Sequence, residues 1–225
     1  MNLLVLGKGK TGSLVAAVAE ERGHQVRALG SAENMDARAL TREALASVDV
    51  VVDFTTPKAV LANIAACAIA GTNMVVGTTG WNESLPRVRE LVAQGGIGFL
   101  YAANFSVGVN MFFEVARTAA AALGRGYRGE IVECHHAQKK DKPSGTAARL
   151  QKIVEDASGV RLEITSLREG DVVGRHEVRL ASSGDTMTLV HEAQSRRGYA
   201  EGAVLAAEWL AGRKGFFEFR NVLQS

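Results

Sequence analysis

Two adjacent histidines, two nearby lysines and a Ser-Gly-Thr turn occur together in one short stretch of this chain. The stretch runs from Ile131 to Ala147 and reads IVECHHAQKKDKPSGTA. A histidine gains or loses a proton near neutral pH, lysines carry fixed positive charge, and a turn that opens a helix presents free backbone N–H donors. Together these groups suit an anionic substrate that must be both held and protonated.

Each polar residue of this stretch has a chemical interpretation and a structural one. A general acid near neutral pH is what an unmodified histidine supplies, so His135 and His136 are candidates; the alternative is a pair of hydrogen-bonded residues at a strand end. Lys139 is long enough to deliver a proton or to anchor an anion. The hydroxyl and N–H donors for a carboxylate come from Ser144, Gly145 and Thr146.

We expect no metal ion at this stretch. Glu133 and Cys134 stand next to His135, but neighbours along a strand point to opposite faces, which is poor geometry for joint ligation. No acyl-transfer residues accompany Cys134. Cys67 is the one other cysteine, and two are too few for a disulfide framework, so we expect reduced thiols in a cytoplasmic protein.

A nucleotide-binding pattern opens the chain. Leu3–Leu6 is a short apolar run of the kind found in strands buried on both faces. It is followed at once by Gly7, Lys8, Gly9, Lys10, Thr11 and Gly12. Glycines at this spacing allow a tight turn and bring a pyrophosphate onto the N–H groups of a helix N-terminus; the alternative is a glycine-rich turn that only packs. The two lysines are either phosphate contacts or solvated side chains.

The end of the second predicted strand, residues 25–29, bears on the choice between NADH and NADPH. An acid usually stands at this position and binds the adenosine ribose, but here the residue is Gly30. Ser31 and a nearby lysine are compatible with a 2′-phosphate, so we expect NADPH to be tolerated. Glu33 is an alternative ribose acid.

Strands and helices alternate along residues 1–105. Apolar strand patterns at 48–54, 73–76 and 98–102 are separated by helical patterns at 58–70 and 83–94. This alternation predicts βαβ units and a Rossmann-like, doubly wound parallel sheet. Ligands bind at the carboxyl ends of such strands, which predicts cofactor contacts from the loops that follow them; ordinary turns with capping threonines are the alternative. These loops contain Asp53, Phe54 and Thr55, then Gly77, Thr78 and Thr79, then Ala102, Ala103, Asn104 and Phe105.

The pattern changes near residue 106. Helical patterns at 109–123 and 146–157 enclose a strand pattern at 129–134, and alternating segments follow at 162–168, 176–181 and 186–193. These elements predict an α+β domain with a mixed sheet. A last helix over about 200–211 and the segment 216–219 return the chain to the first domain. We therefore predict a dinucleotide-binding domain of residues 1–105 and 197–225 and a substrate-binding domain of residues 106–196.

The composition is that of an ordinary globular protein. Hydrophobic residues make up 47% of the 225 positions, and the formal net charge of +2 is too small to argue for nucleic-acid binding. No apolar run reaches the roughly 20 residues needed to cross a bilayer. The chain starts directly on a strand pattern, without a charged lead and cleavage site, so we expect no signal peptide.

Two extended motifs together give this chain a family resemblance. The first is Glu-x-His-His-x-x-Lys-x-Asp-x-Pro-Ser-Gly-Thr-Ala at 133–147, and the second is Ala-Asn-Phe-Ser-x-Gly-Val-Asn at 103–110. With the glycine loop, Ser195-Arg196 and Gly202-Ala203-Val204, nearly the whole chain resembles the dihydrodipicolinate reductase family. Lys142 departs from the family, which commonly has alanine there.

The resemblance implies an oxidoreductase of diaminopimelate and lysine biosynthesis. The expected reaction is the NADPH- or NADH-dependent reduction of 4-hydroxy-tetrahydrodipicolinate to tetrahydrodipicolinate with loss of water, by a homotetramer assembled through the sheet of the second domain. His135 is then the proton donor, Lys139 its partner, and His136, Gly145 and Thr146 the carboxylate-binding residues. The cofactor contacts that the resemblance implies are Gly7–Gly12, Gly77–Thr79, Ala102–Phe105 and Arg196.

Two other functions fit part of the sequence. The first is another amino-acid-pathway dehydrogenase on the same architecture, such as a relative of aspartate or homoserine dehydrogenase; the His-His-x-x-Lys motif argues against it. The second is a dinucleotide-sensing protein without catalysis. The complete set of acid and carboxylate-binding residues argues against a sensor, which has no use for them.

Overall fold

The computed structural model describes residues 1–224 and divides the chain into two compact units. Unit 1 consists of Met1–Ser106 and the segment from Arg197 onward, and unit 2 is Val107–Arg196. The chain therefore leaves the first unit, builds the second, and returns.

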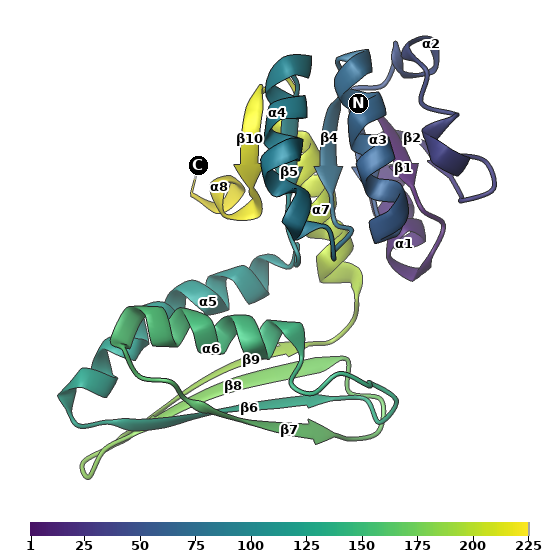
Figure 1. The fold of residues 1–225 in the computed structure, drawn as a ribbon. Helices are drawn as coiled ribbons and strands as arrows, with labels where there is room; N and C mark the ends of the chain where they lie inside the picture. Colours follow the sequence, from purple (N-terminus) through teal and green to yellow (C-terminus); the bar gives the residue numbers. More distant parts are fainter. Residues whose placement is uncertain (225) are drawn as a thin grey trace. The chain divides into compact units, whose positions relative to one another are not determined.

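Unit 1 is built on a six-stranded sheet in the order β10-β5-β4-β3-β1-β2, with every neighbouring pair parallel (Figure 1). Its strands are β1 (Asn2–Leu6), β2 (Gln25–Leu29), β3 (Val50–Asp53), β4 (Asn73–Val76), β5 (Gly98–Tyr101) and β10 (Gly215–Glu218). Because side chains alternate along a strand, Leu3 and Val5 enter one core while Leu4 and Leu6 enter another. The predicted doubly wound parallel sheet is confirmed.

Helices cover both faces of this sheet. They are α1 (Lys10–Glu21), α2 (Arg42–Leu45), α3 (Pro57–Ala70), α4 (Leu85–Gly95), α7 (Arg197–Leu210) and α8 (Phe219–Leu223). Helices α1 and α7 supply one core and α3 and α4 the other. None of the helices within residues 1–224 is both long and apolar enough to cross a membrane.

Unit 2 is a four-stranded mixed sheet with helices on one face (Figure 1). The strand order is β7-β6-β8-β9, and its elements are α5 (Val107–Ala119), β6 (Arg128–His135), α6 (Gly145–Ser158), β7 (Glu163–Arg168), β8 (Gly174–Ala181) and β9 (Thr186–Ala193). Strand β7 runs parallel to β6, whereas the β6–β8 and β8–β9 pairs are antiparallel. Ile131 and Val178 pack against Phe113 and Leu150 of the two helices.

The other face of this sheet has a different composition. Apolar Leu167 and Val190 are 40% and 46% exposed there. Around them, Arg175 forms ion pairs with Glu177 and Glu192. Within unit 2, the sheet thus has one face that forms a core and one that no helix of the unit covers.

Two elements differ from the sequence prediction. The predicted helix at 109–123 ends at Ala119 and tightens into a 3-10 turn, Ala120–Arg125, which closes at Gly126 in a left-handed conformation. Left-handed glycine is a common helix terminator. The segment around 216–219 forms the edge strand β10 beside β5, followed by α8.

Candidate active site

The glycine loop joins β1 to α1 through close backbone packing. Gly7 has a φ of +100°, and a Cβ there would lie 2.3 Å from the carbonyl oxygen of Phe54. A Cβ on Gly12 would lie 1.9 Å from the carbonyl oxygen of Gly7. Gly9, in contrast, has nothing within 4 Å of a Cβ position. Two glycines are therefore required by packing, and Gly9 leaves open space at the start of the helix.

That open space is continuous with a cavity suited to phosphate. Gly9 precedes the first residue of α1 and makes no side-chain cap, so the first backbone N–H groups of the helix have no helical partner. A cavity of about 270 Å³ is lined by Gly9, Lys10, Thr11, Gly12, Phe54, Thr55, Gly77, Thr78 and Thr79. Free N–H groups at a helix N-terminus attract anions. The residues present fit the pyrophosphate of a dinucleotide.

A larger cavity, of about 790 Å³, extends from the glycine loop toward the end of β2. Gly30, Ser31 and Ala32 line it. Next to them, one oxygen of Glu33 accepts hydrogen bonds from the N–H of Gly30 at 2.7 Å and from Lys8 Nζ at 2.6 Å. An acid therefore lies at the end of β2, although it comes three residues later in sequence than the usual ribose acid.

In unit 2, the proton-donor candidate His135 is the last residue of β6 and is 8% exposed. Its Nδ1 hydrogen-bonds to Oε2 of Glu133, two residues earlier on the same face of the strand. Burial lowers the pKa of His135 below its ordinary value, and the bond to Glu133 opposes that effect.

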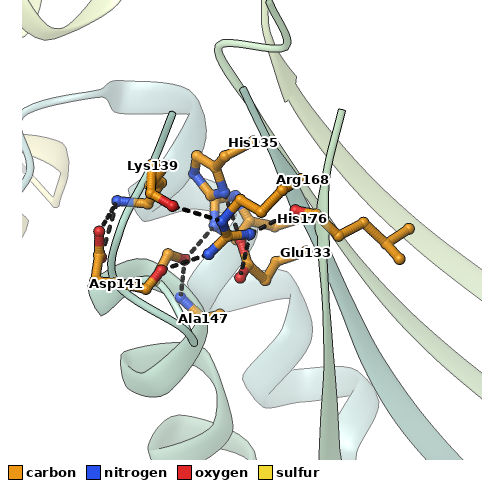
Figure 2. Close-up of polar contacts among 9 residues, drawn as sticks. Glu133, His135, Lys139, Asp141, Ala147, Arg168 and His176 are labelled. Atoms are coloured by element: carbon orange, nitrogen blue, oxygen red, sulfur yellow. Dashed lines mark hydrogen bonds and ion pairs between the residues drawn. The ribbon is translucent and has the colours of Figure 1, made fainter. Parts of the chain in front are cut away.

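Glu133 is completely buried and is also bound from a second strand (Figure 2). Arg168 of β7 places Nη1 2.9 Å from Oε1 of Glu133. Burial would raise the pKa of Glu133, but hydrogen bonds from Ser166, Arg168 and His135 outweigh burial and lower the pKa. The carboxylate is therefore charged and compensated at neutral pH.

His176 of β8 completes the group around His135. The two imidazole rings lie edge to face, with centroids 5.2 Å apart. His176 Nε2 is 3.1 Å from Oγ of Ser144. Burial, followed by the neighbouring His135, lowers the pKa of His176 to about 4, so this ring is neutral at physiological pH.

Lys139 lies on the loop between β6 and α6, with its side chain 23% exposed. Its Nζ is bound by both carboxylate oxygens of Asp141, at 2.7 and 2.8 Å. Arg168 donates to the carbonyl oxygens of Lys139 and Asp141. The same guanidinium that neutralises Glu133 therefore also holds the loop that carries Lys139.

Helix α6 begins at the predicted Ser-Gly-Thr turn. Ser144 is its N-cap, and the hydroxyl accepts a hydrogen bond from the N–H of Ala147 at 3.1 Å. Gly145 is exposed and has nothing within 4 Å of a Cβ position. The N–H groups of Gly145 and Thr146 belong to the first turn, where no helical partner exists. They face an approachable space and can bind a carboxylate.

The predicted substrate-site residues all lie in unit 2, but Ser144 differs from the others in its burial. His135, Lys139, Gly145 and Thr146 are within unit 2, and His136 is half-buried directly after β6. Ser144 is 2% exposed and its hydroxyl contacts Ala147 and His176, so its direct use by a substrate stays a prediction.

Some predicted cofactor contacts lie apart from the two cavities. The residues that line them within the described chain do not include Ala102–Phe105 or Arg196. Phe105 is 2% exposed and stacks edge-on with Phe219, so its side chain belongs to the core of unit 1. The role of these residues toward a cofactor stays a prediction.

The sequence analysis missed three residues of this site. They are Arg168, His176 and Glu133, the last of these in its role as the partner of His135. The spacing of two residues between Glu133 and His135 was a usable signal, because it puts both side chains on one face of a strand. Arg168 and His176 reach the site through strand register, opposite His135 and Glu133 respectively. Nothing local in the sequence indicates that pairing.

Ligand atoms of Glu133, His135 and His176 lie within 4.8 Å of one another, a spacing that could hold a metal ion. The charge on Glu133 is, however, already balanced by Arg168, and its other oxygen is hydrogen-bonded to His135. Glu133 is therefore engaged by His135 and Arg168, and His176 hydrogen-bonds to Ser144 instead. Burial raises the pKa of the neighbouring Cys134 thiol, which is therefore a poor nucleophile.

Comparison with known proteins gives a consistent result for both halves of the chain. Residues 1–105 match the family model described as dihydrodipicolinate reductase, N-terminus, and residues 108–223 match dihydrodipicolinate reductase, C-terminus. A 4-hydroxy-tetrahydrodipicolinate reductase from Christiangramia forsetii is 36% identical, with 99% of this chain and 98% of the relative covered. One from Laribacter hongkongensis is 41% identical over 80% of this chain and 74% of the relative.

Solved structures extend the likeness to the fold. The dipicolinate-bound dihydrodipicolinate reductase of Paenisporosarcina sp. TG-14 superposes with a TM-score of 0.81 at 22% identity, covering 98% of each chain. Aspartate dehydrogenase from Thermotoga maritima gives a TM-score of 0.52 at 11% identity, covering 95% of this chain and 97% of that one.

The fold and the site define an oxidoreductase with a Rossmann-type unit and a second, mixed-sheet unit that carries a buried histidine hydrogen-bonded to a glutamate. Both family models and the curated relatives point to one family within that class. The chain belongs to the dihydrodipicolinate reductase family.

Proposed function

We propose that this chain catalyses the NADPH- or NADH-dependent reduction of 4-hydroxy-tetrahydrodipicolinate to tetrahydrodipicolinate, with loss of water, in diaminopimelate and lysine biosynthesis. Relatives named for this activity at 36–41% identity support the proposal. The observation that carries it is the grouping in unit 2 of a buried histidine, His135, the ammonium of Lys139 and the open first turn of α6. These three features suit a dicarboxylate that must be held and protonated.

The cofactor in this proposal is held by unit 1. The first-turn N–H groups of α1 bind its pyrophosphate, and the loop of Gly77, Thr78 and Thr79 closes the same cavity. The space beside Gly30 and Ser31 receives the adenosine. When bound, the reduced nicotinamide supplies a hydride. No metal ion takes part in this mechanism.

The residues of unit 2 hold the substrate and quench the charge that hydride addition leaves on it. His135 delivers a proton, and the positive charge of Lys139 stabilises the anion. Gly145, Thr146 and His136 hold the carboxylates, so orientation contributes part of the rate. Lys139 is bound to Asp141 in this structure, and a substrate carboxylate competes with Asp141 for that ammonium.

We also propose that unit 2 forms the contacts of a homotetramer and that the enzyme works in the cytoplasm. The exposed face of the mixed sheet, with Leu167 and Val190 among charged residues, supports assembly there. Cys67 and Cys134 are free and buried, which suits a reducing compartment.

The test is reductase activity with the product of a coupled dihydrodipicolinate synthase reaction, followed by the loss of the near-ultraviolet absorbance of NADPH or NADH. His135→Ala should lower kcat by roughly 10²–10⁴-fold, the usual contribution of general acid catalysis. His24→Ala is the matched control, because His24 pairs with Glu208 in unit 1 and should leave kcat unchanged.

Two outcomes would contradict the proposal. Absence of turnover in the wild type, with dinucleotide binding intact by titration, would mean a different substrate or a sensor. Equal kcat in wild type and His135→Ala would remove His135 from the chemistry.

A further inference from the structure

The buried carboxylate of Glu133 uses its two oxygens for different partners. Oε2 binds Nδ1 of His135, and Oε1 binds Nη1 of Arg168 at 2.9 Å. Glu133 is 0% exposed, so neither bond competes with water. Burying a charge costs free energy, and the charge is retained only when its partners compensate it fully. Here those partners include His135, the proposed proton donor.

The contact determines which nitrogen of His135 carries the exchangeable proton. An ionised carboxylate only accepts hydrogen bonds, so Nδ1 of His135 keeps its hydrogen and Nε2 is the atom that gains or loses one. Gly174 of β8 leaves the space beside that atom, because a Cβ there would lie 3.1 Å from Nε2. The site is thus arranged around a histidine of one defined orientation and tautomer.

Arg168 connects the same carboxylate to the loop of the second functional residue. Besides Glu133 it contacts the carbonyl oxygens of Lys139 and Asp141, the first at 3.3 Å. Figure 2 shows Arg168 reaching from its strand between Glu133 and this loop. His135 and Lys139 are therefore oriented by one ion pair.

We propose that Glu133 is a positioning residue for the reduction: it holds His135 through Nδ1, makes Nε2 the proton-delivering atom and stabilises the imidazolium, while Arg168 fixes the Lys139 loop to the same carboxylate. The inference rests on the proposed function, in which His135 is the proton donor. In the step itself the Nε2–H bond breaks, the proton forms a bond to the reduced substrate, and neutral His135 remains with its Nδ1–H on an ionised Glu133. Solvent returns the proton.

The charges around His135 determine in which direction its pKa should change when Glu133 is replaced. Lys139 of the loop and Arg168 of β7 face His135 and disfavour the imidazolium, as burial does, whereas Glu133 favours it. His176 of β8 also faces His135 but is neutral at physiological pH. Glu133→Gln keeps the shape and removes the favourable charge. The pKa of His135 should fall, so the pH above which kcat declines should move downward.

The first measurement is kcat and KM against pH for wild type, Glu133→Gln and Glu130→Gln. Glu130 lies on the same strand, exposed, with Arg179 4.0 Å away, and controls for removing one carboxylate from β6.

We expect Glu133→Gln to shift the decline of kcat by about one to two pH units and to lower kcat near neutral pH by roughly 10–100-fold, since each unit is a factor of ten. Substrate KM should change by less than about threefold, and Glu130→Gln should match the wild type. A purely structural role would lower kcat without moving its pH dependence, and that result would overturn the proposal.

The second measurement needs no turnover and applies even if Glu133→Gln folds poorly. Nitrogen chemical shifts of isotope-labelled histidine report the tautomer and pKa of His135 in the wild-type protein. Neutral His135 protonated at Nδ1 is the expected state; protonation at Nε2 would overturn the proposal. A wild type that lacks reductase activity yet has the Nδ1–H tautomer would contradict the proposed function, while the Glu133–His135 geometry would stand.

Discussion

Glu33 is the acid that lies beside the lining of the larger cavity, next to Gly30 and Lys8. Its carboxylate is held at the end of β2 by the N–H of Gly30 and by Lys8 Nζ. The hydrogen bond from Lys8 lowers the pKa of Glu33, with the bond from Gly30 second. Under the proposed function, a negative charge at this position would accept a ribose hydroxyl of NADH and repel the 2′-phosphate of NADPH.

Replacing Glu33 should therefore change cofactor preference more than activity. We expect Glu33→Gln to raise the ratio of kcat/KM for NADPH to that for NADH by roughly three- to tenfold, a modest change because the pair is half-exposed and screened by salt. Steady-state kinetics with each cofactor at low ionic strength measure the ratio. Glu43→Gln, in the first turn of α2, controls for net charge. A ratio equal in both variants would show that Glu33 does not contact the adenosine end.

At the scale of elements, Asp53 connects the loops that line the two cavities of unit 1. It is the last residue of β3, is completely buried, and accepts hydrogen bonds from the N–H and hydroxyl of Thr55, the hydroxyl of Thr78 and the amide of Asn63. Asn34 extends the network by donating to Asn63 at 2.9 Å. The loops after β3 and β4 and helix α3 thus share one acceptor.

Removing this acceptor should damage both stability and cofactor binding. Asp53→Ala leaves several buried donors unpaired, and we expect it to lower the free energy of unfolding by about 3 kcal/mol and to weaken dinucleotide binding roughly tenfold. Denaturant titration and cofactor titration check the two effects. Asp49→Ala, at an exposed position just before β3, should cost about 1 kcal/mol or less. If Asp53→Ala is destabilised but binds the cofactor with unaltered affinity, the hydrogen-bond network stabilises the fold and does not contribute to cofactor binding.

At the scale of the whole molecule, the mixed sheet of unit 2 has one face buried under α5 and α6 and one uncovered. Apolar side chains on the uncovered face are interspersed with charges, among which Arg175 pairs with Glu177 along β8 and with Glu192 across to β9. A sheet face of this composition is suited to a second copy of the chain, where the apolar residues are buried and the charges remain paired.

The expected assembly has a mass of about four times the 23.9 kDa chain. Val190→Asp, which introduces a charge at a 46% exposed position of that face, should shift the mass measured by light scattering to smaller species. Ile69→Asp is the control, because Ile69 is 71% exposed but lies on α3 of unit 1. Dissociation by Ile69→Asp and not by Val190→Asp would place the interface elsewhere.

Local patterns in the sequence by themselves determined the Rossmann-like sheet, the glycine loop and the stretch that carries His135, Lys139 and the α6 turn. Hydrogen bonds of helices and turns, and the alternation of side chains along a strand, act over a few residues, so they can be recognised without a structure. The family resemblance rests on the same stretches and is confirmed.

The tertiary structure alone decided which distant residues complete the site. Arg168 and His176 reach Glu133 and His135 because β7 and β8 pair with β6 in one particular register, and a shift of one residue would turn both side chains to the other face. Strand register depends on packing between segments far apart in the chain. For that reason, the partners of His135 became visible only in the folded molecule.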